Sequence, residues 1–292
     1  MRYAISHRTR FRYDFPVRFA RCNLRLRPID WDGQQVEDHA LAIGPAATVT
    51  AGRDSGYPVV THRIVVDKPA TELVIDSRAL VTVDRVPPEP KPDDCTVAAA
   101  ARLGRDVRDL GDTAPASYLY PSPLIAAFPE IAAWCAQELR PERGVVEAGL
   151  ALARRIQADF HYDGSATQLD TSPAEAFAKR HGVCQDFAQI MISGARSAGL
   201  AAAYVSGYLR TVPPPGRARL VGADATHAWV LLWCGPERGW IGFDPTNGVA
   251  IGQDHIVTAV GRDYGDVAPI DGIFLGQDGQ RIDVAVDVEP LD

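Results

Sequence analysis

The sequence predicts an α+β protein in which an N-terminal antiparallel β-sandwich-like domain precedes a core with a helix packed on an antiparallel sheet. Residues 1–86 contain short segments that alternate apolar and polar side chains, as half-buried strands do. Prolines are then frequent in residues 87–94, and they favour neither a helix nor a central strand. Beyond them, segments with helical spacing precede segments with strand spacing. We therefore place the β domain at residues 1–86, a proline-rich linker at 87–117 and the core at 118–292.

The first domain is expected to consist of short strands separated by turns. Glycine, proline and aspartate cluster between the apolar segments, which is typical of turns. Several short strands at this spacing favour a small sandwich or a barrel-like domain. The strands are expected at residues 3–13, 23–27, 36–43, 59–66 and 73–83.

The core is expected to begin with helices at residues 129–139 and 145–160, where the apolar side chains have helical spacing. Ser172, Pro173 and Glu175 then form the signature of a helix start, with an N-cap, a proline in the first turn and a capping box. A further helix is expected to begin near Cys184. The strands that follow are expected at residues 201–209, 228–233, 240–243, 257–260 and 282–288.

Charge and composition exclude some classes of partner. The net charge of -7 and the pI of about 5.5 argue against nucleic-acid binding, which needs a basic surface to neutralise phosphates. Residues 1–15 lack the apolar segment of a signal peptide, and no run of 18 apolar residues could span a bilayer. We expect a cytoplasmic protein without a membrane partner, and the sequence leaves the oligomeric state open.

One of the five cysteines has a distinctive context. The five lack paired spacing, which argues against a disulfide framework and a structural zinc site. Cys184, preceded by Gly182, lies where a helix is expected to start. The amides and the dipole of a helix start favour a thiolate and can also stabilise an oxyanion beside it. The backbone amide of Gln185 is a candidate oxyanion donor, although its side chain could serve only as a cap.

A histidine and a carboxylate are expected close to this cysteine. His227 lies near the start of one strand, and Asp244 near the end of the next. A short turn joins these strands, so an antiparallel hairpin brings the two residues side by side. Cysteine, histidine and carboxylate then form the nucleophile, base and orienting group of an acyl-transfer enzyme. A metal site built from the same three residues is the alternative, but zinc sites normally show close ligand pairs that are absent here.

Trp229 follows His227 by two residues and is a candidate substrate-binding side chain. The alternative is that it belongs to the core, because tryptophans that alternate along a hairpin are more often packing residues. The sequence does not decide between these two roles.

Several short motifs follow one another along nearly the whole chain, at residues 7–9 with Tyr13, 24–28, 118–122, 182–188, 204–209, 227–229, 244–248 and 261–267. In this order they resemble the bacterial transglutaminase-like family. The resemblance implies a papain-like core in which Cys184, His227 and Asp244 form the catalytic triad. It also implies that Tyr162 is an oxyanion donor or a wall of the pocket, with core packing as the alternative. The family often has histidine where this chain has Gln189, a difference that could alter the pocket.

The resemblance leaves the reaction open. True transglutaminases pass a glutamine acyl group to a lysine amine, whereas many bacterial relatives are thought to be peptidases or amidases. We expect a cysteine-dependent hydrolase of an amide or peptide bond, with a peptide or protein as substrate and no cofactor. The alternatives are a protein-glutamine gamma-glutamyltransferase and, outside the enzymes, a non-catalytic interaction module.

Overall fold

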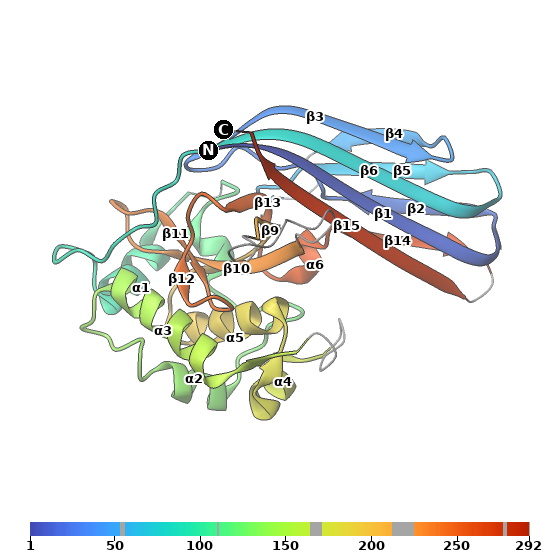
Figure 1. Ribbon diagram of the computed structural model, residues 1–292. Helices are drawn as coiled ribbons and strands as arrows, with labels where there is room; N and C mark the ends of the chain where they lie inside the picture. Colours follow the sequence, from blue (N-terminus) through green and yellow to red (C-terminus); the bar gives the residue numbers. More distant parts are fainter. Residues whose placement is uncertain (53–55, 110, 164–170, 212–224, 277–278, 292) are drawn as a thin grey trace, which may run out of the picture.

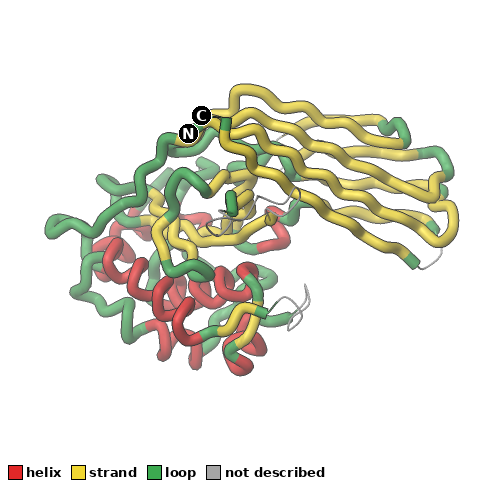
Figure 2. The backbone as a smooth tube through the Cα atoms, viewed as in Figure 1, coloured by secondary structure: helices red, strands yellow, loops and turns green. Residues whose placement is uncertain are grey.

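The computed structural model describes residues 1–52, 56–109, 111–163, 171–211, 225–276 and 279–291. It has two parts that lie side by side (Figure 1). One part is built from strands, and the other combines helices with a second set of strands (Figure 2). The predicted α+β fold class is therefore confirmed.

The first part is a sandwich of two antiparallel sheets, each four-stranded in the described part of the chain, with the orders β15-β1-β6-β3 and β14-β2-β5-β4. Leu24, Ile64 and Ile75 are fully buried between the sheets. Along β6, buried side chains alternate with more exposed ones, which is the pattern that predicted the strand. The N-terminal strands are β1 (Arg2–Val17), β2 (Phe19–Leu24), β3 (Gln34–Gly44), β4 (Thr48–Gly52), β5 (Thr61–Val66) and β6 (Ala70–Val83).

The last two strands complete this sandwich, although the sequence assigned their residues to the core. β14 (Ile270–Leu275) pairs with β2, and β15 (Gln280–Pro290) pairs with β1 from Tyr3↔Pro290 to Tyr13↔Gln280. The two ends of the chain consequently lie together in Figure 1. The boundary expected at residues 118–292 is therefore wrong at its C-terminal end. The alternation of a strand identifies its buried face but does not identify the strand with which it pairs.

The segment predicted as a linker, residues 87–117, also departs from expectation. It contains α1 (Val97–Asp106), which begins at Thr96, where the hydroxyl accepts the Ala99 N–H at 3.2 Å. Val97 and Ala100 are buried in the same apolar cluster as the helices of the core. Residues 87–94, which contain the prolines, form neither a helix nor a strand, whereas the alanines that follow favour a helix. A short 3-10 helix follows at η1 (Pro115–Tyr118).

The second part contains an antiparallel sheet with the strand order β12-β11-β10-β9-β13. Helix α5 packs on β10 and β9, and α2, α3 and α4 pack against α5, so the helices cover one face of the sheet (Figure 1). The strands are β9 (Ala202–Leu209), β10 (Ala225–Trp233), β11 (Trp240–Asp244), β12 (Val249–Ala250) and β13 (His255–Gly261). The helices are α2 (Pro129–Cys135), α3 (Val145–Asp159), α4 (Pro173–Lys179), α5 (Cys184–Ser197) and α6 (Tyr264–Val267).

The sheet curves at the end where the candidate site lies. β11 and β13 are separated in the sheet by β10 and β9, yet their end residues Asp244 and His255 lie within hydrogen-bond distance. The short β12 and the turn after it connect these two regions. This curvature brings side chains from three strands to one point.

Candidate active site

Cys184 is the first residue of α5 and is partly exposed. The N–H of Val183 donates to Asp186 Oδ2 at 2.8 Å, which closes the first turn of the helix. Gly182 packs directly against that carboxylate, since a Cβ on it would lie 2.7 Å from Asp186 Oδ2. The glycine therefore allows the acidic side chain to cap the helix beside the sulfur. The chain reaches this point from α4 through Arg180, which has a φ of 57°.

Tyr162 lies next to this helix start. The two-residue strands β7 (His161–Tyr162) and β8 (His181–Gly182) pair in parallel, with Tyr162 opposite Gly182. Tyr162 is 55% exposed, and burial together with the charge of Cys184 raises the pKa of its hydroxyl. Tyr162 is therefore placed to contact a molecule bound at Cys184. Gln185 is buried in the first turn of α5, and its role as an oxyanion donor stays a prediction.

His227 and Asp244 come together across adjacent strands. The ladder between β10 and β11 ends at Val230↔Phe243, and Asp244 is the next residue of β11. His227 Nε2 lies 2.9 Å from Asp244 Oδ2, and both side chains are buried. Because Nε2 faces the carboxylate, Nδ1 is the ring nitrogen left to exchange a proton with a thiol.

The carboxylate of Asp244 is held by the turn that follows it. Its Oδ1 accepts the N–H groups of Thr246 and Asn247 at 2.9 and 3.2 Å, which is the geometry of an Asx-turn. Its Oδ2 accepts Asn247 Nδ2 at 2.6 Å in addition to His227. The turn and the neighbouring strand thus fix both oxygens before a substrate binds.

The electrostatics of the pair favour a charged histidine. Burial alone lowers the pKa of His227, but hydrogen bonds with Asp244 and Cys184, and the charges of both, outweigh burial and raise it to about 10. For Asp244, burial alone would raise the pKa. Hydrogen bonds from His227 and His255 outweigh burial and hold the pKa of Asp244 well below its usual range. The structure thus brings together Cys184, His227 and Asp244, the three residues that the sequence predicted as a triad.

A second histidine at this point was not predicted from the sequence. His255 begins β13, is buried, and places its Nε2 3.2 Å from Asp244 Oδ2. Strand periodicity predicts residues 257–260 as a strand, but it does not predict that the curved sheet carries His255 to Asp244. The available signal was a histidine before a run of apolar residues, which is equally typical of an ordinary buried strand.

The cluster of His227, Asp244 and His255 also has the composition of a metal site, with one ligand atom from each within 4.8 Å of the others. The hydrogen bonds around His255 do not fit this role. The Gly252 N–H points to His255 Nδ1 at 3.4 Å, so Nδ1 is the acceptor and Nε2 carries the proton. A metal on Nε2 would require that proton to move to Nδ1, where it would face the Gly252 N–H. The donor set therefore fits a hydrogen-bonded carboxylate better than a metal centre.

Trp229 is fully buried and contacts both histidines through its ring. Its centroid lies 5.3 Å from that of His255, edge to face, and 6.1 Å from that of His227. It also packs on Gly207, where a Cβ would lie 2.3 Å from the indole ring. Of the two roles that the sequence left open for Trp229, its complete burial therefore favours the core, where its side chain supports the two histidines.

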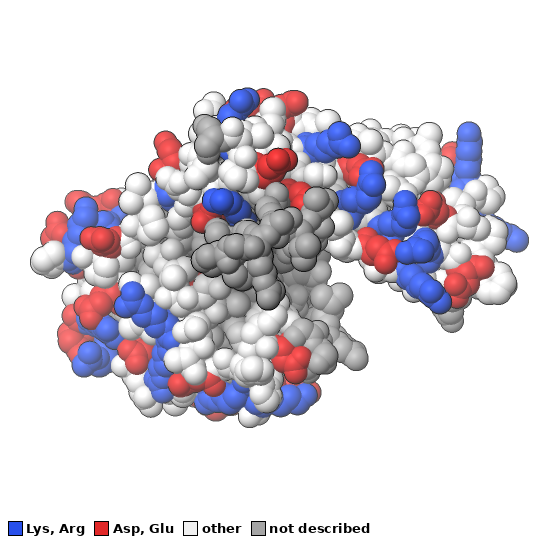
Figure 3. All heavy atoms as spheres, viewed as in Figure 1, with Lys and Arg blue, Asp and Glu red and all other residues white. Residues whose placement is uncertain are grey.

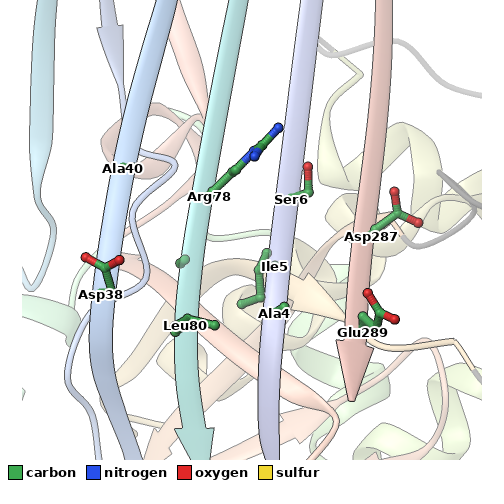
Figure 4. Close-up of a pocket in the computed structure, with 10 residues that line it drawn as sticks. Ala4, Ile5, Ser6, Asp38, Ala40, Arg78, Leu80, Asp287 and Glu289 are labelled. Atoms are coloured by element: carbon green, nitrogen blue, oxygen red, sulfur yellow. The ribbon is translucent and has the colours of Figure 1, made fainter. Parts of the chain in front are cut away.

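Among the hollows formed by the described residues, two bear on where a substrate could bind. One, of about 420 Å³, lies on the outer face of the sandwich between β1, β3, β6 and β15 (Figure 4). Its charged lining residues are Asp38, Arg78, Asp287 and Glu289, and it has no cysteine or histidine among its lining residues. The other, of about 550 Å³, is lined in part by Asn247 and His255 and thus adjoins the candidate active site.

Comparison with known proteins agrees with this arrangement. The model of the bacterial transglutaminase-like N-terminal region matches residues 3–82, and that of the transglutaminase-like superfamily matches residues 133–245. An uncharacterized protein of Mycobacterium bovis is 38% identical over 299 residues, covering 100% of this chain and 93% of the relative. The chain belongs to the transglutaminase-like superfamily. All three predicted triad positions fall within the matched region of the superfamily core.

Two other known proteins are similar to this chain. A crystal structure from Cytophaga hutchinsonii, described provisionally as a cysteine protease, superposes with a TM-score of 0.77 over 100% of this chain and 91% of that one. At 20% identity, this likeness concerns the transglutaminase-like fold alone. A protein-glutamine gamma-glutamyltransferase of Pseudomonas aeruginosa is 40% identical over 120 residues, which cover 39% of this chain and 18% of that protein.

Two features of the rest of the molecule concern possible partners. In the described ranges, no helix combines the length and apolarity needed to cross a membrane. Acidic and basic side chains are interspersed on the face shown in Figure 3. The cytoplasmic location and the absence of nucleic-acid and membrane partners stay predictions.

Proposed function

We propose that this protein hydrolyses an amide or peptide bond through a thioester on Cys184. The observation that carries the proposal is the position of His227, which interacts with Cys184 on one side and lies 2.9 Å from a buried carboxylate on the other. This is the arrangement of nucleophile, base and orienting group in cysteine acyl-transfer enzymes.

Before acylation, the Cys184 thiol gives its proton to His227 Nδ1, a transfer that the raised pKa of His227 favours. In the acylation step, the sulfur attacks the carbonyl carbon of the substrate. The amide nitrogen then takes the proton from His227 as the C–N bond breaks, and the amine leaves. Asp244 keeps its charge throughout and stabilises the imidazolium, which is consistent with its lowered pKa. The backbone amide of Gln185 and the hydroxyl of Tyr162 are our candidates for donors to the oxyanion.

In the deacylation step, water attacks the thioester while His227 takes one of its protons. The C–S bond breaks, a carboxylic acid leaves, and the proton returns to the sulfur. The same scheme gives acyl transfer if an amine replaces water. The Pseudomonas aeruginosa relative, described as a protein-glutamine gamma-glutamyltransferase, favours keeping this second reaction as the alternative.

The two reactions differ in the fate of the acyl group. We would incubate the enzyme with a glutamine-containing peptide, with and without a primary amine such as dansylcadaverine, and follow the products by mass spectrometry. Hydrolysis predicts a free acid whose yield changes little when the amine is added. Efficient incorporation of the amine would instead support the transferase.

The control for this experiment is Cys184→Ala, which removes the nucleophile. Either reaction predicts that this variant forms neither product. If it were as active as wild type, the thioester mechanism would be wrong. If wild type itself were inactive on all amides and esters, a non-catalytic interaction module would be the better description.

A further inference from the structure

The feature that the proposed mechanism leaves unused is His255. It comes from β13, which is not adjacent to β11 in the sheet, and reaches Asp244 only because the sheet curves. Its side chain is buried and its Nε2 lies 3.2 Å from Asp244 Oδ2, the same oxygen that faces His227. Two histidines therefore share one carboxylate oxygen.

The direction of this hydrogen bond follows from the turn before β13. The Gly252 N–H donates to His255 Nδ1 at 3.4 Å, and the His255 N–H bonds back to the Gly252 carbonyl at 3.3 Å. Because Nδ1 is the acceptor, Nε2 carries the hydrogen and donates it to Asp244. Oδ2 thus receives three donors, His227, His255 and Asn247.

We propose that His255 is a positioning residue that donates to Asp244 and thereby limits how strongly this carboxylate holds a proton on His227. This inference rests on the proposed function, because it assigns a role to His255 within the same reaction. Each donor to Oδ2 stabilises the carboxylate and partly neutralises its negative charge. The carboxylate therefore attracts the imidazolium of His227 less strongly. The hydrogen bond from His255 also favours the ionised form of Asp244.

The groups that contact the two histidines support an effect of His255 on His227 through Asp244. His227 faces Cys184 from α5, Asp244 from β11 and His255 from β13. The ring of His255 faces Asp244 and the buried indole of Trp229. Arg85 also approaches His255, but its Nη1 donates to the backbone carbonyl at 2.9 Å. Asp244 is accordingly the group through which His255 acts on His227.

The consequence for the reaction concerns the leaving amine. An amine leaves only after His227 has given it a proton, and an imidazolium that is held too firmly is a weaker acid. Loss of the His255 donor should therefore slow the cleavage of amides more than that of activated esters, whose leaving groups need no proton. A residue that only supports the fold would slow both reactions alike.

The test compares His255→Gln, which retains an N–H donor, with His255→Phe and His255→Met, which retain none. The pKa of His227 is followed by NMR of labelled histidine, a measurement that requires no substrate. We expect it to rise by roughly 0.5–1 in His255→Phe and His255→Met, because one hydrogen bond to a charged group is lost, and by less than half as much in His255→Gln. In parallel, the ratio of amide to ester turnover should fall about threefold in the variants without a donor.

The control is His39→Phe, the same substitution in β3 of the sandwich, which should leave the pKa of His227 unchanged. The proposal is overturned if that pKa stays constant without the donor, or if His255→Gln shifts it as far as His255→Phe does. The methionine variant replaces His255→Phe in this comparison if the larger ring prevents folding. Absence of turnover in wild type would refute the proposed function, whereas the NMR titration would still test the hydrogen bond.

Discussion

His227 Nε2 lies 2.9 Å from Asp244 Oδ2, and this contact joins two neighbouring strands just beyond the last paired residues of their ladder. The carboxylate is fully buried and also accepts two backbone N–H groups from the turn after it. A charge buried in this way is stable only because its partners satisfy it. The site is therefore organised around Asp244, although Cys184 performs the proposed chemistry.

Asp244→Asn tests this role of the carboxylate. The substitution keeps the shape of the side chain but removes the charge that raises the pKa of His227. We expect turnover to fall by about 10²- to 10⁴-fold, as for the loss of the orienting carboxylate in other triads. The measurement is kcat/KM against pH, and the control is Asp76→Asn, which affects only an exposed ion pair with Arg8 on the sandwich. Near-normal turnover of Asp244→Asn would contradict the role of the charge.

Gly182→Ala tests the start of α5. The added Cβ would lie 2.7 Å from Asp186 Oδ2 and 2.9 Å from its Cβ, so the cap or the backbone must move. We expect a loss of about 1–3 kcal/mol in stability and slower alkylation of Cys184, because the helix start and the sulfur move together. Gly56→Ala is the matched control, since a Cβ there meets no atom within 4 Å. Equal melting temperatures for the two variants would show that the close contact has no cost.

His7 predicts how stability depends on pH. This residue of β1 is buried and hydrogen-bonded to Tyr208 and Thr9, and burial lowers its pKa to about 4 from an ordinary value of 6.5. Between these values the unfolded chain binds more protons than the folded one, so stability falls as the pH falls from 6.5 towards 4. The free energy of unfolding that is lost in this way because of His7 is on the order of 3 kcal/mol in total.

The effect of His7 can be measured by urea unfolding at pH 7.5, 5.5 and 4 in wild type and His7→Gln. We expect wild type to lose more stability on acidification than the variant, because glutamine does not titrate. His161→Gln, a change at an exposed histidine, should behave as wild type does. Parallel curves for wild type and His7→Gln would contradict the prediction.

The sequence predicted those parts of the fold that depend on local chemistry. The capping box of Ser172 and Glu175 is present as expected, with the Glu175 N–H 3.3 Å from the Ser172 hydroxyl. The start of α5 at Cys184 and the hairpin that brings His227 near Asp244 were also predicted. Each depends on a few neighbouring residues or on one short turn.

The parts that were not predicted depend on contacts between distant segments. β15 pairs with β1, although nearly the whole length of the chain separates the two strands. The alternation of apolar and polar side chains in β15 does not identify β1 as its partner. Helix α1 lies within the segment expected to be a linker, because packing on the core stabilises a helix that follows prolines. His255 reaches Asp244 through the curvature of the sheet, which is a property of several strands together.

The most direct test of the proposed mechanism is the alkylation of each cysteine by iodoacetamide against pH, followed by mass spectrometry in wild type and His227→Ala. Burial raises the pKa of Cys22 to about 11 and that of Cys135 to about 12, so these thiols should react slowly at pH 6. The mechanism predicts that Cys184 reacts at least tenfold faster than they do, and that this advantage is lost without His227. If Cys184 reacts no faster than the other thiols, or reacts equally fast without His227, the histidine does not activate it and the central claim is wrong.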